Sequence, residues 1–586
     1  MINLKDIQSP ADIKGKSVPE LANLAAQIRM ALLEKLSRHG GHVGPNLGFV
    51  EATIALHYVF NSPVDKIVFD VSHQCYTHKM LTGRVRAFID PAHYDDVTGF
   101  TEPRESDHDF FTVGHTSTAI SMACGLARAR DFKGGKENII TVIGDGSLSG
   151  GEAFEGLDNA ALLHSNFIVV VNDNQMAIAE NHGGLYADLR LLRNTKGKDQ
   201  VNYFRSLGFD YRYVAEGNSL TALIKVFQEV KDIDHPIVVH ICTEKGAGYR
   251  PAIENKEKWH FETPFDTATG TVFADEHPAD NYSDLTAKLL IDLMEKDPRV
   301  VAITSATPAV MGFTPELRKQ VGNRFLDVGI AEEHAAAMSS GLAKGGMRPF
   351  WGVYSTFVQR AYDQISQDIA INNNPAVIGV FAAGVRSMND VTHLCWFDIP
   401  LLSNIPNIVM LSPTCRREYE AMFHWAMRQT DHPVVLRIPA QFVELPQLQV
   451  SDDYSDLNTF QQVEGGHDIA IIAVGSMLSY ALDAAKQLRA KGINPTVINP
   501  RFVSGIDAEM LSSLSPDHRA VITVEDGILD GGFGQKVAAF YGDTPMQVKC
   551  MGLPKTFHDR FNPEKLADEC GLTSDGIVAT AMTMFK

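Results

Sequence analysis

Two polar triplets, each placed directly after an apolar run, carry oxygen atoms that could bind a metal ion. Gly-Asp-Gly at residues 144–146 follows the run 139–143, and Asn-Asp-Asn at residues 172–174 follows the run 167–171. The interval between the runs is long enough for one helix, which predicts two neighbouring parallel strands joined by a crossover helix. Oxygen ligands at the carboxyl ends of two such strands suit a hard divalent cation, which often shares its ligands with phosphate. The triplets therefore predict a site for a cation and a diphosphate.

The side chains suited to the cation are those of Asp145 and Asn174. Gly146 and Ser147 open the next helix, where backbone N–H groups without a helical partner favour a phosphate. Among cofactors, this combination points to thiamine diphosphate held through Mg²⁺. The alternative interpretation is a tight strand–helix turn, in which the glycines only allow the bend. Gly-Asp-Gly alone does not separate the two interpretations, but its pairing with Asn-Asp-Asn favours the cofactor site.

The composition of the chain is that of an ordinary globular protein. Its 586 residues suggest three or four domains, and 45% of them are hydrophobic and 21% charged. The net charge of −19 argues against nonspecific binding to nucleic acid or to an anionic membrane surface. The sequence has no apolar run long enough for a transmembrane helix, and its N-terminus lacks the apolar core of a signal peptide. The seven cysteines form no CxxC pair, which argues against a disulfide framework or a zinc site and predicts a cytoplasmic location.

Helix and strand patterns alternate along the chain, which predicts an α/β fold with parallel sheets covered by helices on both faces. The expected strands are at residues 139–143, 167–171, 236–242, 300–304, 376–381, 469–474, 496–499 and 521–524, and the expected helices at residues 18–37, 46–60, 151–163, 354–371 and 478–490. The polar segment 440–467 is interpreted as a linker. We therefore expect three doubly wound domains, at residues 1–280, 281–450 and 451–586.

Several longer motifs carry a resemblance to a known family. They are Gly-Gly-His-Val-Gly-Pro-Asn-Leu-Gly at 40–48, Asp-Val-Ser-His-Gln at 70–74, Val-Gly-His-Thr-Ser-Thr at 113–118, Asp-Val-Gly-Ile-Ala-Glu-Glu-His at 327–334, and Tyr-Ser-Thr-Phe-Val-Gln-Arg-Ala-Tyr-Asp-Gln at 354–364. With these motifs the chain resembles the thiamine-diphosphate transketolase superfamily, most closely the 1-deoxy-D-xylulose-5-phosphate synthases, over nearly its whole length. The resemblance implies a transketolase-like fold, thiamine diphosphate and Mg²⁺ as cofactors, and a homodimer.

The resemblance also implies which residues bind the cofactors. Mg²⁺ would be bound by Asp145, Asn174 and the backbone carbonyl of Met176. Thiamine diphosphate would be lined by His73, Gly114, His115, Thr116, Gly146, Ser147, Asn174, Tyr249 and Phe357. Glu332 would be catalytic, because the matching glutamate hydrogen-bonds the aminopyrimidine ring and promotes formation of the reactive ylid. From the residues alone, the alternative for Glu332 is an exposed carboxylate at a helix start, paired with Arg360 or His334.

On the substrate side, the resemblance implies that His42 and His260 transfer protons near the reacting atoms. The residues expected to face the acceptor are Tyr354, Arg360, His393 and Arg437, with His393 also catalytic. The chain has 21 histidines, so position within a motif carries this argument and histidine content does not. An arginine suits a phosphate because its planar fork donates two hydrogen bonds at once. The alternative for Arg437 is a surface salt bridge at a strand end.

The acceptor side departs from the family pattern. The family usually reads Asp-Arg-Ala-Gly and then Asp-Gly-x-Thr-His, whereas this chain has Ala382 in place of the arginine and Asn389 in place of the second aspartate. Loss of one charged phosphate contact should cost about 1.5–3 kcal/mol. Arg386 is a candidate to replace it. The segment between Asn181 and Gly217 is also roughly thirty residues shorter than the family insert. A preserved cofactor half and an altered acceptor half are expected of a paralogue with a changed acceptor.

The leading hypothesis is a carboligase that decarboxylates pyruvate and joins the two-carbon unit to an aldehyde, which we expect to be phosphorylated. The resemblance places such an enzyme in isoprenoid precursor biosynthesis. A second hypothesis is a transketolase that moves a ketol unit between sugars, and release of CO₂ from pyruvate separates the two. A third is a non-catalytic paralogue that binds a ligand or partner. The complete set of Asp145, Asn174, Glu332, His42 and His260 argues against it.

Overall fold

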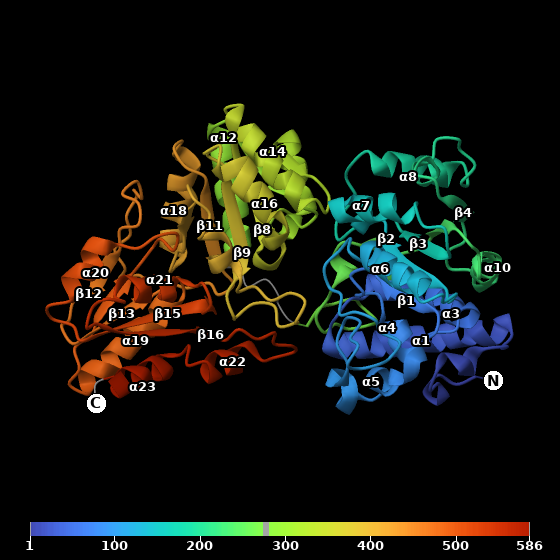
Figure 1. The fold of residues 1–586 in the computed structure, drawn as a ribbon, viewed down its shortest axis with the longest axis horizontal. Coiled ribbons are helices and arrows are strands. Elements are labelled where there is room, and N and C mark those ends of the chain that lie inside the picture. Colours follow the sequence, from blue (N-terminus) through green and yellow to red (C-terminus); the bar gives the residue numbers. More distant parts are fainter. Residues whose placement is uncertain (1, 274–280, 585–586) are drawn as a thin grey trace. The chain divides into compact units, whose positions relative to one another are not determined.

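The computed structural model describes residues 2–273 and 281–584 (Figure 1), which fall into two compact units. Unit 1 contains the described residues up to 273 together with Gly329–Ala331, and unit 2 contains the rest. Across the described ranges, every helix is too short or too polar to cross a lipid bilayer.

Unit 1 is built on a five-stranded parallel sheet with the strand order β1-β2-β3-β5-β4. Its strands are β1 (Lys66–Phe69), β2 (Ile139–Gly144), β3 (Phe167–Asp173), β4 (Asp210–Val214) and β5 (Pro236–Cys242). β2 and β3 pair directly, with Gly144 opposite Asn172. The predicted pair of neighbouring strands is therefore confirmed, and the two polar triplets lie at one edge of the sheet.

Helices cover both faces of this sheet, as expected from the burial of its central strands β2, β3 and β5. One face packs against α1 (Val18–His39), α3 (Val50–Val59) and α10 (Leu220–Val230), and the other against α6 (Ala119–Phe132), α7 (Gly151–Ala160) and α8 (Leu185–Asn194). Successive residues of β2 and β3 alternate between the two hydrophobic cores. The shorter helices of unit 1 are α2 (Gly44–Gly48), α4 (Tyr76–Lys79), α5 (Arg86–Ile89), α9 (Tyr203–Ser206) and α11 (Arg250–Glu254).

The single helix predicted at residues 46–60 is wrong, because this segment forms α2 and α3 with a break between them. The backbone leaves the helical conformation at Phe49, where φ is −112° and ψ is 13°. A Cβ atom at Gly48 would lie 2.8 Å from the carbonyl oxygen of Glu244. The loop that follows β5 therefore approaches the end of α2 closely, which only glycine allows.

Unit 2 contains two sheets. The first has the order β10-β11-β9-β8-β6-β7 and is parallel throughout, and the second has the order β12-β14-β13-β15-β16. The strands are β6 (Val300–Thr304), β7 (Phe325–Asp327), β8 (Arg348–Tyr354), β9 (Val377–Ala383), β10 (Val409–Leu411), β11 (Val434–Pro439), β12 (Gln461–Glu464), β13 (Ile469–Ala473), β14 (Thr496–Asn499), β15 (Ala520–Ile528) and β16 (Gln547–Leu553). With the sheet of unit 1, the predicted α/β fold with three parallel sheets is confirmed, apart from the antiparallel edge strand β12.

Helices cover both faces of the two sheets of unit 2 as well. They are α12 (Tyr282–Lys296), α13 (Pro315–Val321), α14 (Glu332–Lys344), α15 (Ser355–Val358), α16 (Tyr362–Gln364), α17 (Asp398–Leu402), α18 (Arg416–Arg428), α19 (Met477–Ala490), α20 (Ala508–Leu514), α21 (Phe533–Phe540), α22 (Pro563–Glu569) and α23 (Ser574–Met584). One hydrophobic core contains side chains from both sheets, such as Ile303 and Ile378 of the first and Ile472 and Val521 of the second. The two sheets of unit 2 therefore share a core.

Two predictions for unit 2 are wrong. The segment 440–467 is not only a linker, because its residues Gln461–Glu464 form β12, which pairs antiparallel with β14. This strand was not predicted because its sequence is polar. An edge strand is half exposed and need not be apolar. The long helix predicted at 354–371 is also interrupted: Tyr354 ends β8, and short helical segments follow it.

Candidate functional site

The carboxyl ends of β2 and β3 bring Asp145 and Asn174 together in unit 1. The backbone N–H of Asn174 lies 3.4 Å from Oδ1 of Asp145. Burial, and then the charge of Asp173, raise the pKa of Asp145 to about 7. Oδ1 of Asn174 is buried and has no hydrogen-bond partner among the residues that the structure describes. A buried carboxylate and an unpaired amide oxygen are costly by themselves and are stabilised by a hard cation, so these residues fit Mg²⁺.

Other residues of this loop fit the same site. Met176 follows Asn174 by two residues and bridges to the backbone of Glu180. Nδ2 of Asn181, a residue that the sequence interpretation left unassigned, donates to Oδ2 of Asp145 at 2.7 Å. Its Oδ1 is buried without a hydrogen-bond partner within the described part of the chain. The loop therefore presents two unpaired amide oxygens beside the Asp145 carboxylate.

We predict that Mg²⁺ binding weakens as the pH falls below about 7. The cation needs the ionised form of Asp145, and the raised pKa of that carboxyl means that protons compete for it near neutrality. The apparent dissociation constant should increase up to about tenfold for each pH unit below 7. Calorimetric titration of Mg²⁺ at pH 6 and pH 8 checks this. Equal affinity at both values would contradict the raised pKa.

Gly146 and Ser147 lie in a short 3₁₀ turn directly after Asp145. A Cβ atom on Gly146 would lie 2.8 Å from the Cα of Ala177, so the close approach of these two loops requires glycine. The hydroxyl of Tyr186 donates to the carbonyl of Gly146 at 3.2 Å, and that of Ser117 donates to the carbonyl of Ser147 at 2.7 Å. The turn is thus fixed from both sides, as a binding site for phosphate requires.

Gly114, His115 and Thr116 lie in the loop that precedes α6. Asp70, at the end of β1, accepts from the backbone N–H groups of Ser117 at 2.9 Å and Ala119 at 3.1 Å. This loop is therefore anchored at the same edge of the sheet as the two polar triplets.

Three predicted histidines of unit 1 form one aromatic cluster. The ring centroids of His42 and His73 are 5.0 Å apart, those of His73 and His260 are 5.2 Å apart, and those of His42 and His260 are 5.7 Å apart. Nδ2 of Asn46 donates to the backbone carbonyls of His42 and His73, which fixes their loops relative to each other. Burial, and then the charge of Lys245, hold the pKa of His260 well below its usual value. His260 is therefore neutral near pH 7.

Lys245 is a candidate site residue that the sequence interpretation missed. Its Nζ donates to the carbonyl of Ala177 at 2.7 Å and lies 3.1 Å from Nδ1 of His260. Burial lowers its pKa to about 7. The sequence offered a signal for Lys245, because this residue lies in the glycine-rich turn after β5 that ends at Tyr249.

Tyr249 itself packs edge-on against Trp259, and its hydroxyl is buried without a hydrogen-bond partner among the described residues.

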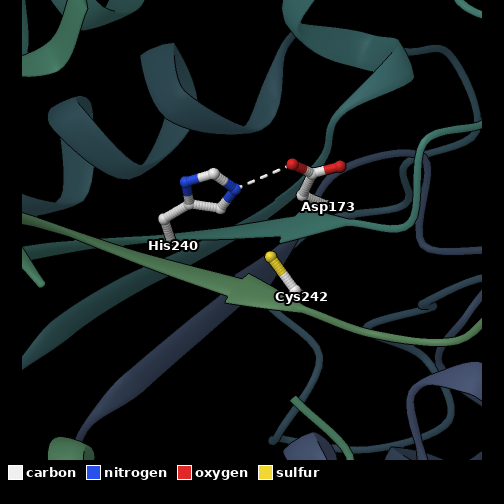
Figure 2. Close-up of side chains that lie close together, drawn as sticks. All are labelled: Asp173, His240 and Cys242. Atoms are coloured by element: carbon white, nitrogen blue, oxygen red, sulfur yellow. Dashed lines mark hydrogen bonds and ion pairs between the residues drawn. The ribbon is translucent and has the colours of Figure 1, made fainter. Parts of the chain in front are cut away.

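The middle residue of the Asn-Asp-Asn triplet, Asp173, belongs to a second network of polar side chains (Figure 2). Asp173 accepts a hydrogen bond from Nε2 of His240 at 2.9 Å and forms an ion pair with Arg193. Burial opposes ionisation of Asp173, but His240 and Arg193 outweigh it and lower the pKa of this carboxyl. The thiol of Cys242 lies close to this pair and bonds to the hydroxyl of Tyr213, with its pKa raised to about 11 by burial. Asp173 is therefore a fixed negative charge, and this charge helps to raise the pKa of Asp145.

In unit 2, Glu332 is the first residue of α14 and is only 3% exposed. Its Oε2 lies 3.4 Å from Nη1 of Arg360. Burial raises the pKa of Glu332, and the positive charge of Arg360 partly offsets this effect. The alternative interpretation of Glu332 was an exposed carboxylate at a helix start, paired with Arg360 or His334. The pairing with Arg360 is present, but the expected exposure is wrong because Glu332 is buried. A buried carboxyl with a raised pKa holds its proton more readily than an exposed one and is a candidate for proton transfer.

Three predicted aromatic residues of unit 2 also lie together. The rings of Tyr354 and Phe357 are edge-on with centroids 5.8 Å apart, and those of Phe357 and His393 are edge-on at 5.7 Å. Nδ1 of His393 is 2.7 Å from the hydroxyl of Thr392. Burial raises the pKa of Tyr354 to about 12, so its hydroxyl is neutral and can donate a hydrogen bond.

Comparison with known proteins decides the family. Residues 4–203 and 194–243 match the family model described as 1-deoxy-D-xylulose-5-phosphate synthase, residues 280–444 match the transketolase pyrimidine binding domain, and residues 459–577 match the transketolase C-terminal domain. The chain is 38% identical to the 1-deoxy-D-xylulose-5-phosphate synthase of Symbiobacterium thermophilum, over 99% of this chain and 94% of that protein. It is also 38% identical to the synthase of Caldanaerobacter subterraneus, over 100% of this chain and 99% of that protein. The chain belongs to the 1-deoxy-D-xylulose-5-phosphate synthase family.

In this member of the synthase family, the remaining predicted substrate residues have partners within unit 2. Arg437 is fully buried between Asp398 and Asp526, so the surface salt bridge considered for it is wrong. Arg386 pairs with Glu564 at 3.0 Å, and its guanidinium lies 4.6 Å from the ring centroid of Tyr480. Nδ2 of Asn389 donates to the carbonyl of Phe561 at 3.1 Å. These partners are distant in sequence, so no local sequence motif predicts the contacts.

Proposed function

We propose that this protein is a thiamine-diphosphate-dependent carboligase that decarboxylates pyruvate and joins the two-carbon unit to an aldehyde. One observation supports the proposal most: in a chain of the 1-deoxy-D-xylulose-5-phosphate synthase family, the buried carboxylate of Asp145 lies beside Asn174, whose Oδ1 is buried and has no hydrogen-bond partner among the described residues. A non-catalytic paralogue has no need to maintain such a costly arrangement.

The side chains of Asp145 and Asn174 and the carbonyl of Met176 would hold Mg²⁺. The residues that would hold the cofactor are His73, Gly114, His115, Thr116, Gly146, Ser147, Tyr249 and Phe357. Bound thiamine diphosphate supplies the stabilised carbanion that decarboxylation and carbon–carbon bond formation need. Glu332 would hold a proton at the aminopyrimidine, because its pKa is raised by burial.

The remaining residues would act on substrates. His260 is neutral and would accept a proton from a substrate hydroxyl, with His42 beside it in the same cluster. Tyr354, Arg360 and His393 would position the aldehyde. We further propose three domains at residues 1–280, 281–450 and 451–586, a homodimer, a cytoplasmic location, and a 1-deoxyketose product used in isoprenoid precursor synthesis. The seven cysteines, none of which forms a disulfide, support a reducing compartment.

The test is a CO₂ assay with purified protein, thiamine diphosphate, Mg²⁺ and pyruvate, with and without an aldehyde. Release of CO₂ that increases with the aldehyde, together with a new ketose, supports the proposal. Transfer of a ketol unit from a ketose phosphate without use of pyruvate would favour the transketolase alternative. No turnover of either kind, in protein that binds the cofactor, would favour the non-catalytic alternative.

Replacing Lys245 by methionine should move the acid limb of the pH–rate profile to higher pH. The positive charge of Lys245 helps to hold down the pKa of His260, so its removal should raise that pKa and protonate the histidine at a higher pH. The profile of kcat/KM for pyruvate against pH measures this shift. Lys245→Arg, which keeps the charge, is the matched control. An unchanged acid limb in Lys245→Met would show that this charge does not act on the histidine cluster.

A further inference from the structure

Each of the three arginines expected on the acceptor side is paired with a carboxylate of its own unit. Arg360 pairs with Glu332, Arg386 with Glu564, and Arg437 with both Asp398 and Asp526. A phosphate group carries a charge between −1 and −2 near neutral pH and needs positive charge that is not already balanced. The charges around the acceptor site therefore decide which aldehydes can bind.

Arg437 differs from the other two arginines because it pairs with two carboxylates, although its Nη2 has no hydrogen-bond partner among the described residues. Its Nε donates to Oδ2 of Asp398 at 2.6 Å and its Nη1 donates to Oδ1 of Asp526 at 2.7 Å. The side chain of Arg437 is 1% exposed, and those of Asp398 and Asp526 are 0% and 5% exposed. One guanidinium that pairs with two carboxyl groups has no positive charge left over for a further anion. Burial raises the pKa of Asp398, and a proton there would make the cluster neutral, not positive.

This cluster lies directly against the loop that carries the predicted acceptor residues. Arg437 is opposite Val380 in the pairing of β11 with β9, so it neighbours the end of β9 where Ala382 stands. A Cβ atom on Gly384, at the start of the following loop, would lie 2.0 Å from Oδ2 of Asp526. The same loop continues to Asn389 and His393. A dianion bound beside this loop would face Asp526 at short range.

Arg386 does not compensate for Ala382. Its guanidinium is held by Glu564 at 3.0 Å and by the carbonyl of Leu572 at 3.2 Å, and it stacks on Tyr480. Its side chain is only 6% exposed. Moving it to a phosphate would break all of these contacts.

We propose that the acceptor of this enzyme is an aldehyde without a phosphate group, of the neutral hydroxyaldehyde class. This inference rests on the proposed function and names its second substrate. The groups that would face such an acceptor are hydrogen-bonding ones, the Tyr354 hydroxyl, the His393 ring and the Asn389 amide. Hydroxyl, ring-nitrogen and amide groups can recognise the hydroxyls of a substrate that carries no charge.

D-glyceraldehyde and D-glyceraldehyde 3-phosphate are the matched probes, because they differ only by the phosphate. We expect kcat/KM for the unphosphorylated aldehyde to be at least about tenfold higher, since like charges in a binding site oppose association. Inorganic phosphate should not compete with D-glyceraldehyde. Equal or greater use of the phosphorylated aldehyde would overturn the inference and leave the proposed carboligase function standing. No consumption of pyruvate with either aldehyde would overturn both.

Asp526→Asn tests the charge argument within the same assay. It keeps the shape of the side chain and removes one of the two charges that neutralise Arg437. We expect the ratio of kcat/KM for the phosphorylated over the unphosphorylated aldehyde to increase about tenfold, and inorganic phosphate to become an inhibitor. Asp530→Asn is the matched control, because it removes an equal charge from an exposed residue nearby in the sequence.

Ala382→Arg provides a second variant that does not disturb the buried cluster itself. Adding a guanidinium beside the end of β9 should also increase the ratio in favour of the phosphorylated aldehyde. If both variants are folded and neither changes the ratio, the charge of this cluster does not select the acceptor and the inference fails.

Discussion

Glu332→Gln is expected to reduce kcat for pyruvate turnover by about 10²–10⁴-fold, the range for loss of a residue that transfers a proton. Glutamine keeps the size and the polarity of the side chain but cannot hold or release a proton. The effect should be large because Glu332 is 3% exposed at the start of α14, where water cannot easily replace it. Glu332→Ala should abolish turnover.

Binding measurements distinguish a chemical role from a structural one. Glu332→Gln should still bind Mg²⁺ and thiamine diphosphate, as measured by calorimetry, while turnover falls. Glu333→Gln is the matched control, since it removes the same charge from the adjacent residue of the same helix. Near-normal turnover in Glu332→Gln would show that Glu332 is not a catalytic residue. Its ion pair with Arg360 would then be structural.

Asp145→Asn should have two opposite effects, a weaker cofactor site and a more stable protein in the absence of cofactor. Loss of a charged ligand should weaken Mg²⁺-dependent binding of thiamine diphosphate by about 10–100-fold. The amide can still be accommodated, because Asn181 has an unpaired Oδ1 that can accept from it after a rotation.

The gain in stability follows from the raised pKa of Asp145. In the unfolded chain this carboxyl has an ordinary pKa near 4, whereas in the folded protein its pKa is about 7. The wild-type protein without cofactor therefore loses stability as the pH increases from about 4 to 7, and the Asp145→Asn substitution removes that loss, because an amide does not ionise. Thermal unfolding of the two cofactor-free proteins should show a higher Tm for the variant at pH 8 and no difference below pH 4. A lower Tm for the variant at pH 8 would contradict the desolvation of this carboxyl.

The parts of the fold that could be predicted from the sequence are those with a local signal. Strands buried on both faces are continuous apolar runs, so residues 236–242, 300–304 and 496–499 were predicted with the bounds that β5, β6 and β14 have. The proximity of Asp145 and Asn174 could be predicted because each residue follows such a run closely. The edge strands β12 and β16 are not predicted, because they are half exposed and their sequences are correspondingly polar. The buried strands β8 and β10 are not predicted either, because β8 contains Pro349 and Gly352 and β10 has only three residues.

The acceptor side could not be predicted in the same way. Asp398 and Asp526 are 39 and 89 residues away from Arg437, and only the folded chain brings their charges together. The resemblance assigned a role to Arg437 from its position, but position alone does not reveal which carboxylates neutralise it. Lys245 was missed for a different reason, since its motif was visible but its contact with His260 depends on the packing of two loops.

The core shared by the two sheets of unit 2 has a consequence for folding. Ile303 and Ile378 of one sheet and Ile472 and Val521 of the other belong to the same packed cluster, although they lie on opposite sides of the polar segment 440–467. A truncated chain that ends in this segment would expose the apolar side chains of the remaining half of that cluster to water. Residues 281–584 should therefore melt in a single cooperative transition, and neither half should be obtained as an independently folded fragment.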